Sequence, residues 1–223
     1  MAEAAPDALI LAGGRGERLG MGLKAFVALN GATLLEWAIR AVRPAAGRIM
    51  VAVPAGTDDD ARRLLPPEVI VLVGGATRID TIAILVESAT SASLLMHDVV
   101  HPLADRALVA RVIEGARDTG AACAAIPLSG SVRRSSAGAL GAPIDGPLWL
   151  ATKPAVVPRD AVRHGIAIER RRPTMGHFGV LDLVGRSGIR IVTVPSDPAN
   201  LKITDEVDLR LAERLAPKWT GWG

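Results

Sequence analysis

A glycine-rich stretch near the N-terminus carries charges that could do chemistry. The sequence LILAGGRGERLGMGLKAF, residues 9–26, passes from an apolar run to closely spaced glycines, with Arg15, Arg18 and Lys24 among them. Glycines lack a Cβ, so backbone N–H groups can approach an anion closely, and nearby cations add attraction. A polyphosphate is the anion that this stretch favours.

Two common phosphate-binding patterns do not describe this loop. The spacing G-x-x-x-x-G-K-[ST] is absent, and Gly14-x-Gly16 is followed by Leu19 where a dinucleotide fingerprint needs its third glycine. The loop is therefore neither a Walker loop nor a dinucleotide-binding turn.

A second group of polar residues lies in MHDVVHPL, residues 96–103. Asp98 follows an apolar run that reads as a strand, where its carboxylate could help to hold Mg²⁺ on nucleotide phosphates or could cap a turn. His97 and His101 are four residues apart, but the preceding strand and Pro102 make helical spacing doubtful. We predict a structural His97 and no zinc site.

Length and composition place limits on the protein. The chain has 223 residues, 49% of them hydrophobic and only 3% aromatic, which predicts one domain with an aliphatic core. We expect this domain to span residues 1–216, followed by a frayed tail at 217–223 with two exposed tryptophans. Cys123, the single cysteine, lies in an apolar run and is expected to be buried and inert, without a disulfide framework.

Charge and hydropathy also limit the partners and the location. The formal charge of +3 fits an anionic partner, but basic residues are spread along the chain, so we do not expect nucleic acid binding. The N-terminus lacks a basic leader, and no apolar run approaches the roughly 20 residues that cross a bilayer. We expect a cytoplasmic protein without a membrane partner.

The order of apolar segments predicts the fold. Buried strands are expected at residues 8–12, 48–53, 69–73, 93–97, 121–127 and 189–194. Helical segments alternate with them, the clearest being 33–42, 105–118 and 204–216; the first begins with Thr33 and Glu36 in capping-box spacing. This alternation predicts an α/β fold with a mainly parallel, doubly wound sheet.

One segment interrupts this alternation. Residues 128–149, LSGSVRRSSAGALGAPIDGPLW, are rich in glycine, serine and proline. Such a composition predicts a surface loop or an arm that protrudes from the sheet.

Four motifs in matching order resemble those of a known family. AGGRGERLG with Lys24 resembles the signature of sugar-nucleotide pyrophosphorylases and cytidylyltransferases. Residues 74–82 (GGATRIDTI), 96–103 (MHDVVHPL) and 200–213 (NLKITDEVDLRLAE) are similar to segments of 2-C-methyl-D-erythritol 4-phosphate cytidylyltransferases. The resemblance implies a Rossmann-like nucleotide-diphospho-sugar transferase fold and a role in isoprenoid biosynthesis.

The resemblance also implies a reaction and a set of residues. A phosphate oxygen of the acceptor would attack the α-phosphorus of CTP in line, and pyrophosphate would leave, with Mg²⁺ as the cofactor. The family pattern assigns catalysis to Arg18, Lys24 and Lys202, and the metal to Asp98. It assigns nucleotide binding to Ala12, Gly13, Gly14, Gly16, Gly75, Thr81 and Asp98. Arg78 would organise the loop around Gly75.

Departures from the family pattern gather on the acceptor side. His101 stands where the family has an arginine, which suggests a weaker or pH-dependent grip on phosphate. No arginine follows Asp145 in IDGPLW, and His177 and Phe178 replace another family motif. The acceptor-binding residues expected in this chain are His101, Ser131, Arg133 and Lys153.

The nucleotide loop also departs from the family pattern. The loop before Lys24 is one residue shorter, with Leu23 in place of a proline.

Three functional hypotheses follow from this comparison. The first is a cytidylyltransferase acting on 2-C-methyl-D-erythritol 4-phosphate or a related small acceptor. The second keeps the chemistry but uses another polyol phosphate or a phosphonate, and the third is a degenerate homologue that binds nucleotide or a partner without turnover. The segment 128–149 resembles the family's dimerisation arm, so a homodimer is expected.

Overall fold

A seven-stranded sheet forms the centre of the computed structural model, which describes residues 4–14, 16, 18–171, 179–218 and 220–222. The strand order is β11-β7-β10-β6-β1-β4-β5. The strands are β1 (Asp7–Leu11), β4 (Ile49–Val53), β5 (Ile70–Val73), β6 (Ser93–Asp98), β7 (Ala122–Pro127), β10 (Trp149–Pro158) and β11 (Val192–Pro195). All neighbours pair in parallel except β10, which runs antiparallel to both β6 and β7.

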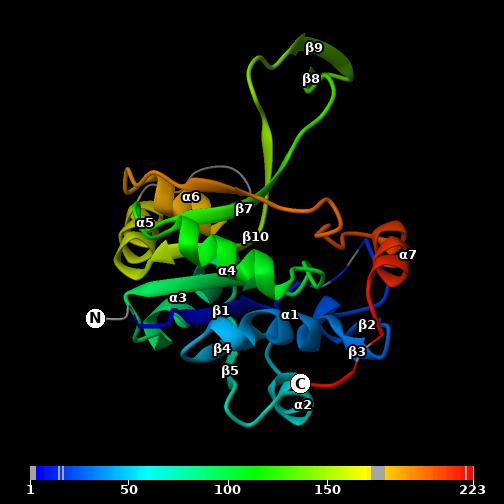
Figure 1. The fold of residues 1–223 in the computed structure, drawn as a ribbon, viewed down its shortest axis with the longest axis vertical. Coiled ribbons are helices and arrows are strands. Elements are labelled where there is room, and N and C mark those ends of the chain that lie inside the picture. Colours follow the sequence, from blue (N-terminus) through cyan, green and yellow to red (C-terminus); the bar gives the residue numbers. More distant parts are fainter. Residues whose placement is uncertain (1–3, 15, 17, 172–178, 219, 223) are drawn as a thin grey trace.

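Helices cover both faces of this sheet (Figure 1). The α-helices are α1 (Leu34–Val42), α2 (Asp58–Leu64), α3 (Arg78–Ser88), α4 (Arg106–Gly115), α5 (Arg159–Arg171), α6 (Val180–Gly185) and α7 (Glu206–Leu215). Short 3₁₀ helices are η1 (Lys24–Phe26) and η2 (Arg43–Ala45). Residues of α1, α2, α4 and α7 belong to one apolar cluster, and residues of α3, α5 and α6 to the other. This arrangement confirms the predicted α/β class.

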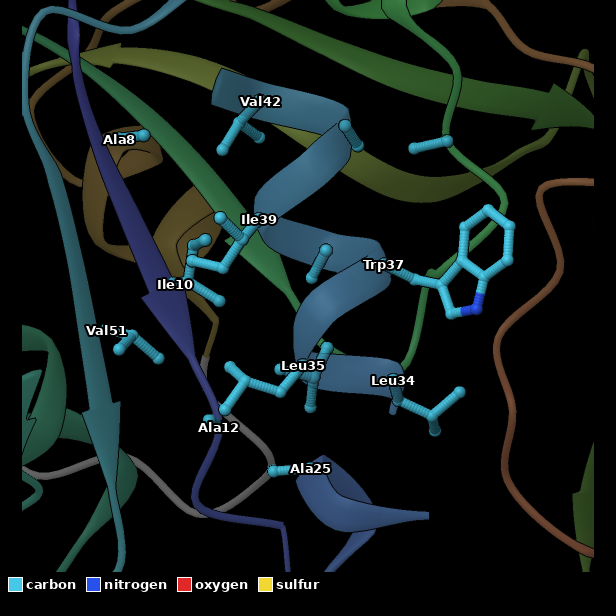
Figure 2. Close-up of a cluster of buried hydrophobic side chains, with 14 of the residues drawn as sticks. Ala8, Ile10, Ala12, Ala25, Leu34, Leu35, Trp37, Ile39, Val42 and Val51 are labelled. Carbon is cyan, nitrogen blue, oxygen red and sulfur yellow. The ribbon is translucent and has the colours of Figure 1, made fainter. Parts of the chain in front are cut away.

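Alternation along β1 explains the two clusters. Ala8 and Ile10 lie in the first cluster, and Leu9 and Leu11 lie in the second, because successive side chains of a strand point to opposite faces. Figure 2 shows the first cluster, where Ile39 of α1 lies over β1 beside Ile10. The side chains in both clusters are almost entirely aliphatic, as the low aromatic content predicts.

The capping box predicted for α1 is present. Thr33 Oγ1 accepts a hydrogen bond from the Glu36 backbone N–H at 3.2 Å, and the Thr33 N–H donates to Glu36 Oε2 at 2.7 Å. These bonds satisfy two helix-end donors and stabilise the start of α1 by about 1 kcal/mol. Leu35 and Ile39 are thereby fixed on the buried face.

The segment between β7 and β10 forms an arm that projects from the body of the domain (Figure 1). It contains the antiparallel strands β8 (Arg133–Ser136) and β9 (Ala139–Pro143), whose residues are all exposed. Ala137 and Gly138 join them with positive φ angles of 50° and 78°, as a tight hairpin turn requires. A smaller pair, β2 (Ala28–Leu29) and β3 (Ala32–Thr33), lies before α1. Of the two alternatives that the composition left open, a surface loop and a protruding arm, the structure shows the arm.

Two features differ from the sequence-based expectations. The sequence pattern does not predict β10 as a strand, because Pro154 interrupts its apolar run; the structure accommodates this with a register shift between Ala151 and Ala155. The expectation of a frayed tail with exposed tryptophans is wrong for Trp222. This residue is partly buried against the first cluster, and its carbonyl accepts a hydrogen bond from Arg43 Nη1 at 3.3 Å. Trp219 lies outside the described residues.

Within the described part of the chain, none of the helices combines the length and the apolar character that a bilayer span requires.

Candidate active site

The predicted site residues converge at one edge of the sheet. Leu11 at the end of β1 pairs with Asp98 at the end of β6. The glycine loop, which follows β1, therefore begins beside Asp98. Gly74 and Gly75 follow the end of β5 at the same edge. Ligands of open parallel sheets bind beyond the carboxyl ends of the strands, and this edge is therefore the candidate active site.

The glycine loop closes around Lys24. The Lys24 backbone N–H donates to Gly14 O at 3.1 Å, and the N–H groups of Leu19 and Gly20 donate to Gly16 O at 2.8 and 3.0 Å. Gly16 has a φ of +67°, and a Cβ there would lie 2.3 Å from Gly22 O. Only glycine fits this position without moving the loop.

The outer part of the loop is open. Nothing lies within 4 Å of the place that a Cβ on Gly13 would occupy, and Gly13 and Gly14 are exposed. Ala12, by contrast, is fully buried in the first cluster and anchors the loop to the core, its N–H donating to Ala52 O at 3.0 Å. The backbone after β1 is therefore accessible to an anion.

Lys24 is held firmly by main-chain carbonyls. Its Nζ donates to Ile203 O at 2.8 Å and to Thr204 O at 3.0 Å, and the residue is 9% exposed. Burial, followed by the nearby charges of Arg18 and Lys202, lowers the pKa of Lys24. The structure thus brings together the three predicted catalytic cations, although they come from distant parts of the sequence. Arg18 and Lys202 are exposed, so both can reach a ligand above the loop.

Thr81 stabilises the glycine turn at Gly74 and Gly75, which follows β5. Its Oγ1 accepts a hydrogen bond from the Gly75 N–H at 3.1 Å and donates to Thr77 O at 3.0 Å. A Cβ on Gly75 would lie 2.4 Å from the Cβ of Asp80, so the turn packs tightly against the start of α3. In this structure the Thr81 hydroxyl is used within the chain, and direct contact of Gly75 and Thr81 with a nucleotide stays a prediction.

Arg78 links this turn to β6. Its Nη2 donates to Asp98 Oδ2 at 3.0 Å and to Oδ1 at 3.3 Å. Burial by itself would raise the pKa of Asp98, but the positive charges of Lys153 and Arg78 outweigh it, so the pKa is lowered. Asp98 is 8% exposed and is held as a carboxylate at neutral pH.

The two histidines of the second motif are neutral at neutral pH. Burial, with the charge of His101, lowers the pKa of the fully buried His97 to about 3, which fits the structural role predicted for it. Burial also lowers the pKa of His101 to about 4, and its Nδ1 lies 3.4 Å from Asn200 O. The expected pH dependence at His101 is therefore displaced below the ordinary histidine range. Among the described residues, no three His, Cys, Asp or Glu side chains are grouped to hold a metal.

The four predicted acceptor-binding residues separate into two places. His101 and Lys153 are buried beside Asp98, and the charge of Lys153 influences the pKa of both other residues. Ser131 and Arg133 lie instead on the projecting arm, where Arg133 Nε donates to Ser131 Oγ at 3.2 Å. Within one chain, the structure does not bring the arm residues to the buried pair. The departures at His177 and Phe178 lie outside the described residues.

Asn200 is a site residue that sequence reasoning missed. Its Nδ2 donates to Lys153 O at 2.6 Å and to Ser196 Oγ at 3.1 Å, and its own carbonyl faces His101. The residue is 2% exposed and ties the loop carrying Lys202 to β10. The only sequence signal was its place at the start of the NLKIT motif.

Cys123 is buried as expected. Burial raises the pKa of its thiol, and its Sγ donates to Ala124 O at 3.1 Å. Such a thiol is protonated and unreactive at neutral pH.

Comparisons with known proteins agree with this geometry. Residues 7–217 match the model of a family described as IspD, 2-C-methyl-D-erythritol 4-phosphate cytidylyltransferase. A protein of that name from Thermus thermophilus is 36% identical over 231 aligned residues, covering 95% of this chain and 97% of the relative. A protein of the same name from Deinococcus radiodurans is 33% identical, covering 93% of this chain and 88% of the relative. The crystal structure of a Thermus thermophilus enzyme of this name superposes with a TM-score of 0.79 at 33% identity, covering 95% of this chain and 98% of that one.

Proposed function

This chain belongs to the 2-C-methyl-D-erythritol 4-phosphate cytidylyltransferase family, and we propose that it transfers CMP from CTP to 2-C-methyl-D-erythritol 4-phosphate, with release of pyrophosphate. This reaction would place it in isoprenoid biosynthesis. The observation that carries the proposal is the cluster of Arg18, Lys24 and Lys202 around an open glycine loop, next to the carboxylate of Asp98.

The cation cluster suits a triphosphate. Burial is the largest cause of the lowered pKa of Lys24, and the positive charges of Arg18 and Lys202 lower it further, so each of these two cations repels the Lys24 ammonium in the free protein. An anion above the loop would relieve this repulsion. During transfer, negative charge grows on the α-phosphoryl oxygens and on the leaving pyrophosphate, and preorganised cations can lower the barrier by several kcal/mol.

The nucleophile comes from the substrate. A phosphate oxygen of the acceptor would attack the α-phosphorus in line and form a new P–O bond, as the bond to the bridging oxygen of pyrophosphate breaks. No side chain of the site needs to form a covalent intermediate. The chain's own residues would orient the two phosphates and compensate charge.

Mg²⁺ is the proposed cofactor, with Asp98 as its protein ligand. The donor set fits an ion held mainly by the triphosphate, because Asp98 is a single carboxylate already bonded to Arg78. Mg²⁺ commonly binds to one carboxylate and to substrate phosphates. When bound, the ion would neutralise charge on the phosphates.

A second candidate keeps the chemistry and changes the acceptor to another polyol phosphate or a phosphonate. It is favoured by His101, a buried neutral side chain at the position where the family has a permanent cation.

Pyrophosphate release from CTP with Mg²⁺ tests both candidates. Release with 2-C-methyl-D-erythritol 4-phosphate is the expected result, and release only with other polyol phosphates or phosphonates selects the second candidate. CTP binding without release for any acceptor would refute both and favour a homologue that binds without turnover.

We also propose a homodimer formed through the arm, with a cytoplasmic location. Exposed Leu140, Trp149 and Leu150 on and near the arm give it an apolar surface that a second copy could cover. Light scattering at micromolar concentration should give a mass near twice that of the 23.2 kDa chain. A monomer at that concentration would contradict the proposal.

A further inference from the structure

Asn30 joins the β2–β3 hairpin to the C-terminal end of α7. With Gly31 it forms the two-residue turn of the hairpin, and their φ angles of +46° and +97° are the positive values that such a turn requires. Its Nδ2 donates to two main-chain carbonyls at the end of α7, Glu213 O and Ala216 O, each at 2.9 Å. Because both partners can only accept, the NH₂ group of the amide must face the helix.

The carbonyl of Glu213 needs a donor from outside α7. In an α-helix each carbonyl accepts from the N–H four residues later, and the residue four after Glu213 is Pro217, which has no N–H. The Asn30 amide takes the place of this missing donor, although 183 residues separate it from Glu213 in the sequence. The C-terminal end of α7 is therefore closed by the hairpin.

The other end of α7 holds Lys24. The Lys24 ammonium donates to Ile203 O and Thr204 O, which lie just before the helix. The Thr204 N–H in turn donates to Oδ2 of Asp208, in the first turn of α7, at 2.7 Å. The two carbonyls that hold Lys24 are thus tied to the helix itself.

Lys24 and Asn30 lie at the two ends of one compact segment. The Val27 N–H donates to Lys24 O at 3.1 Å, and the Trp37 indole N–H donates to Leu29 O at 2.8 Å, which fixes the segment to α1. Strand β2, between Lys24 and Asn30, contacts α7 (Figure 1). The segment therefore lies along α7 and binds it by hydrogen bonds at both ends.

Apolar packing holds α7 by a narrow face. Its buried residues are Leu209 and Ala212, whereas Val207, Leu211 and Leu215 are exposed. A helix with so little buried apolar surface depends on the hydrogen bonds at its ends for its exact place.

We propose that Asn30 is a positioning residue: by closing the C-terminal end of α7, it holds the helix so that the Ile203 and Thr204 carbonyls place the Lys24 ammonium beside the glycine loop. The inference rests on the proposed function and adds a residue that lies outside the four motifs pointing to that function. Asn30 binds the opposite end of α7 from Lys24, so its effect on the reaction passes through Lys24.

Steady-state kinetics with CTP and 2-C-methyl-D-erythritol 4-phosphate test this role. Asn30→Gly permits the positive φ but removes the amide, and Asn30→Asp keeps the size of the side chain but sets carboxylate oxygens against the two carbonyls. Each variant should lower kcat at least about fivefold and leave both KM values within about twofold of wild type. Ser187→Ala is the matched control, because it also removes a side-chain donor to a main-chain carbonyl, Ala161 O at 3.0 Å, and it should behave as wild type.

A double-mutant cycle separates positioning from a merely structural role. If Asn30 acts through Lys24, Asn30→Gly should change kcat by less than about twofold in the Lys24→Ala background. A merely structural amide would lower the resistance to urea in both backgrounds and leave the kcat of the folded enzyme unchanged.

A spectroscopic measurement follows Lys24 without turnover. The chain has four lysines, so lysine-selective ¹³C labelling gives few signals, and Lys24→Arg assigns the signal of Lys24. Both Asn30 variants should shift this signal. The signal of Lys153, on β10, is the internal reference and should stay in place.

The outcomes separate this inference from the proposed function. A kcat within about twofold of wild type in both Asn30 variants, or an equal fall of kcat with and without Lys24, would overturn the inference and leave the proposed function standing. If the wild type forms no product with any acceptor, the proposed function is overturned and the Lys24 signal decides alone. A shift in both variants would then support the positioning of Lys24, and an unmoved signal would overturn it.

Discussion

Acidification should destabilise this protein through two buried histidines. His97 and His101 have folded-state pKa values of about 3 and about 4, below the ordinary value of 6.5 that applies in the unfolded chain. The unfolded chain therefore binds protons more readily between pH 6.5 and pH 4. The stability due to the neutral histidines is complete above pH 6.5 and is lost as the pH falls toward the folded-state values.

The size of the effect follows from these values. Between pH 7 and pH 5, each histidine should remove about 2 kcal/mol of stability, so the pair should remove about 4 kcal/mol. Asp98 adds little in this interval, because its lowered pKa matters only near and below the ordinary value of 3.8. A loss of about 4 kcal/mol is a large part of the roughly 5–15 kcal/mol typical of a domain.

Urea unfolding at pH 7 and pH 5 measures this loss directly. His97→Leu and His101→Gln replace a titrating ring with a side chain that does not titrate, so each variant should lose about 2 kcal/mol less than wild type on acidification. His164→Gln, an exposed position on α5, is the matched control and should lose as much as wild type. The reasoning would be refuted if His97→Leu and His101→Gln both showed the wild-type loss.

Two further predictions concern the nucleotide loop. Arg18→Ala and Lys24→Ala should each lower kcat at least about tenfold with a modest loss of CTP affinity, as contacts made in the transition state do; unchanged turnover in both would remove them from the mechanism. Gly16→Ala should weaken CTP binding more than Gly20→Ala, because both glycines have positive φ but only a Cβ at Gly16 meets the Gly22 carbonyl, at 2.3 Å. Equal CTP affinities in calorimetry would show that this contact does not shape the loop.

The fold class and the nucleotide end of the site could be predicted because their signals are local. The apolar run of β1, the capping box at Thr33 and the glycines from Gly13 onward each depend on near neighbours in the sequence. Strand, turn and helix preferences act over a few residues, so they can be read without knowing the rest of the chain. The glycine, serine and proline content of residues 128–149 likewise predicted a surface loop or a protruding arm, and the structure shows the arm.

The acceptor end depends on contacts between distant segments. Lys153 lies in an interrupted apolar pattern that does not predict β10. Only the folded chain brings its positive charge close enough to Asp98 to lower the pKa of that carboxyl against the effect of burial. Asn200 was missed because its contacts with Lys153 and His101 join segments 47 and 99 residues apart. Trp222 was expected to be exposed and is partly buried for the same reason: its contact with Arg43 joins segments that are far apart in the sequence.

The sequence by itself determined which residues could carry charge, where the glycine turns and the sheet strands other than β10 lie, and which family the motifs resemble. Only the tertiary structure decided which of those charges are buried, paired or exposed. The physical reason is that burial and electrostatic coupling depend on distance through space. Lys24, Arg18 and Lys202 become one cation cluster, and His101 becomes a neutral side chain, only after the chain has folded.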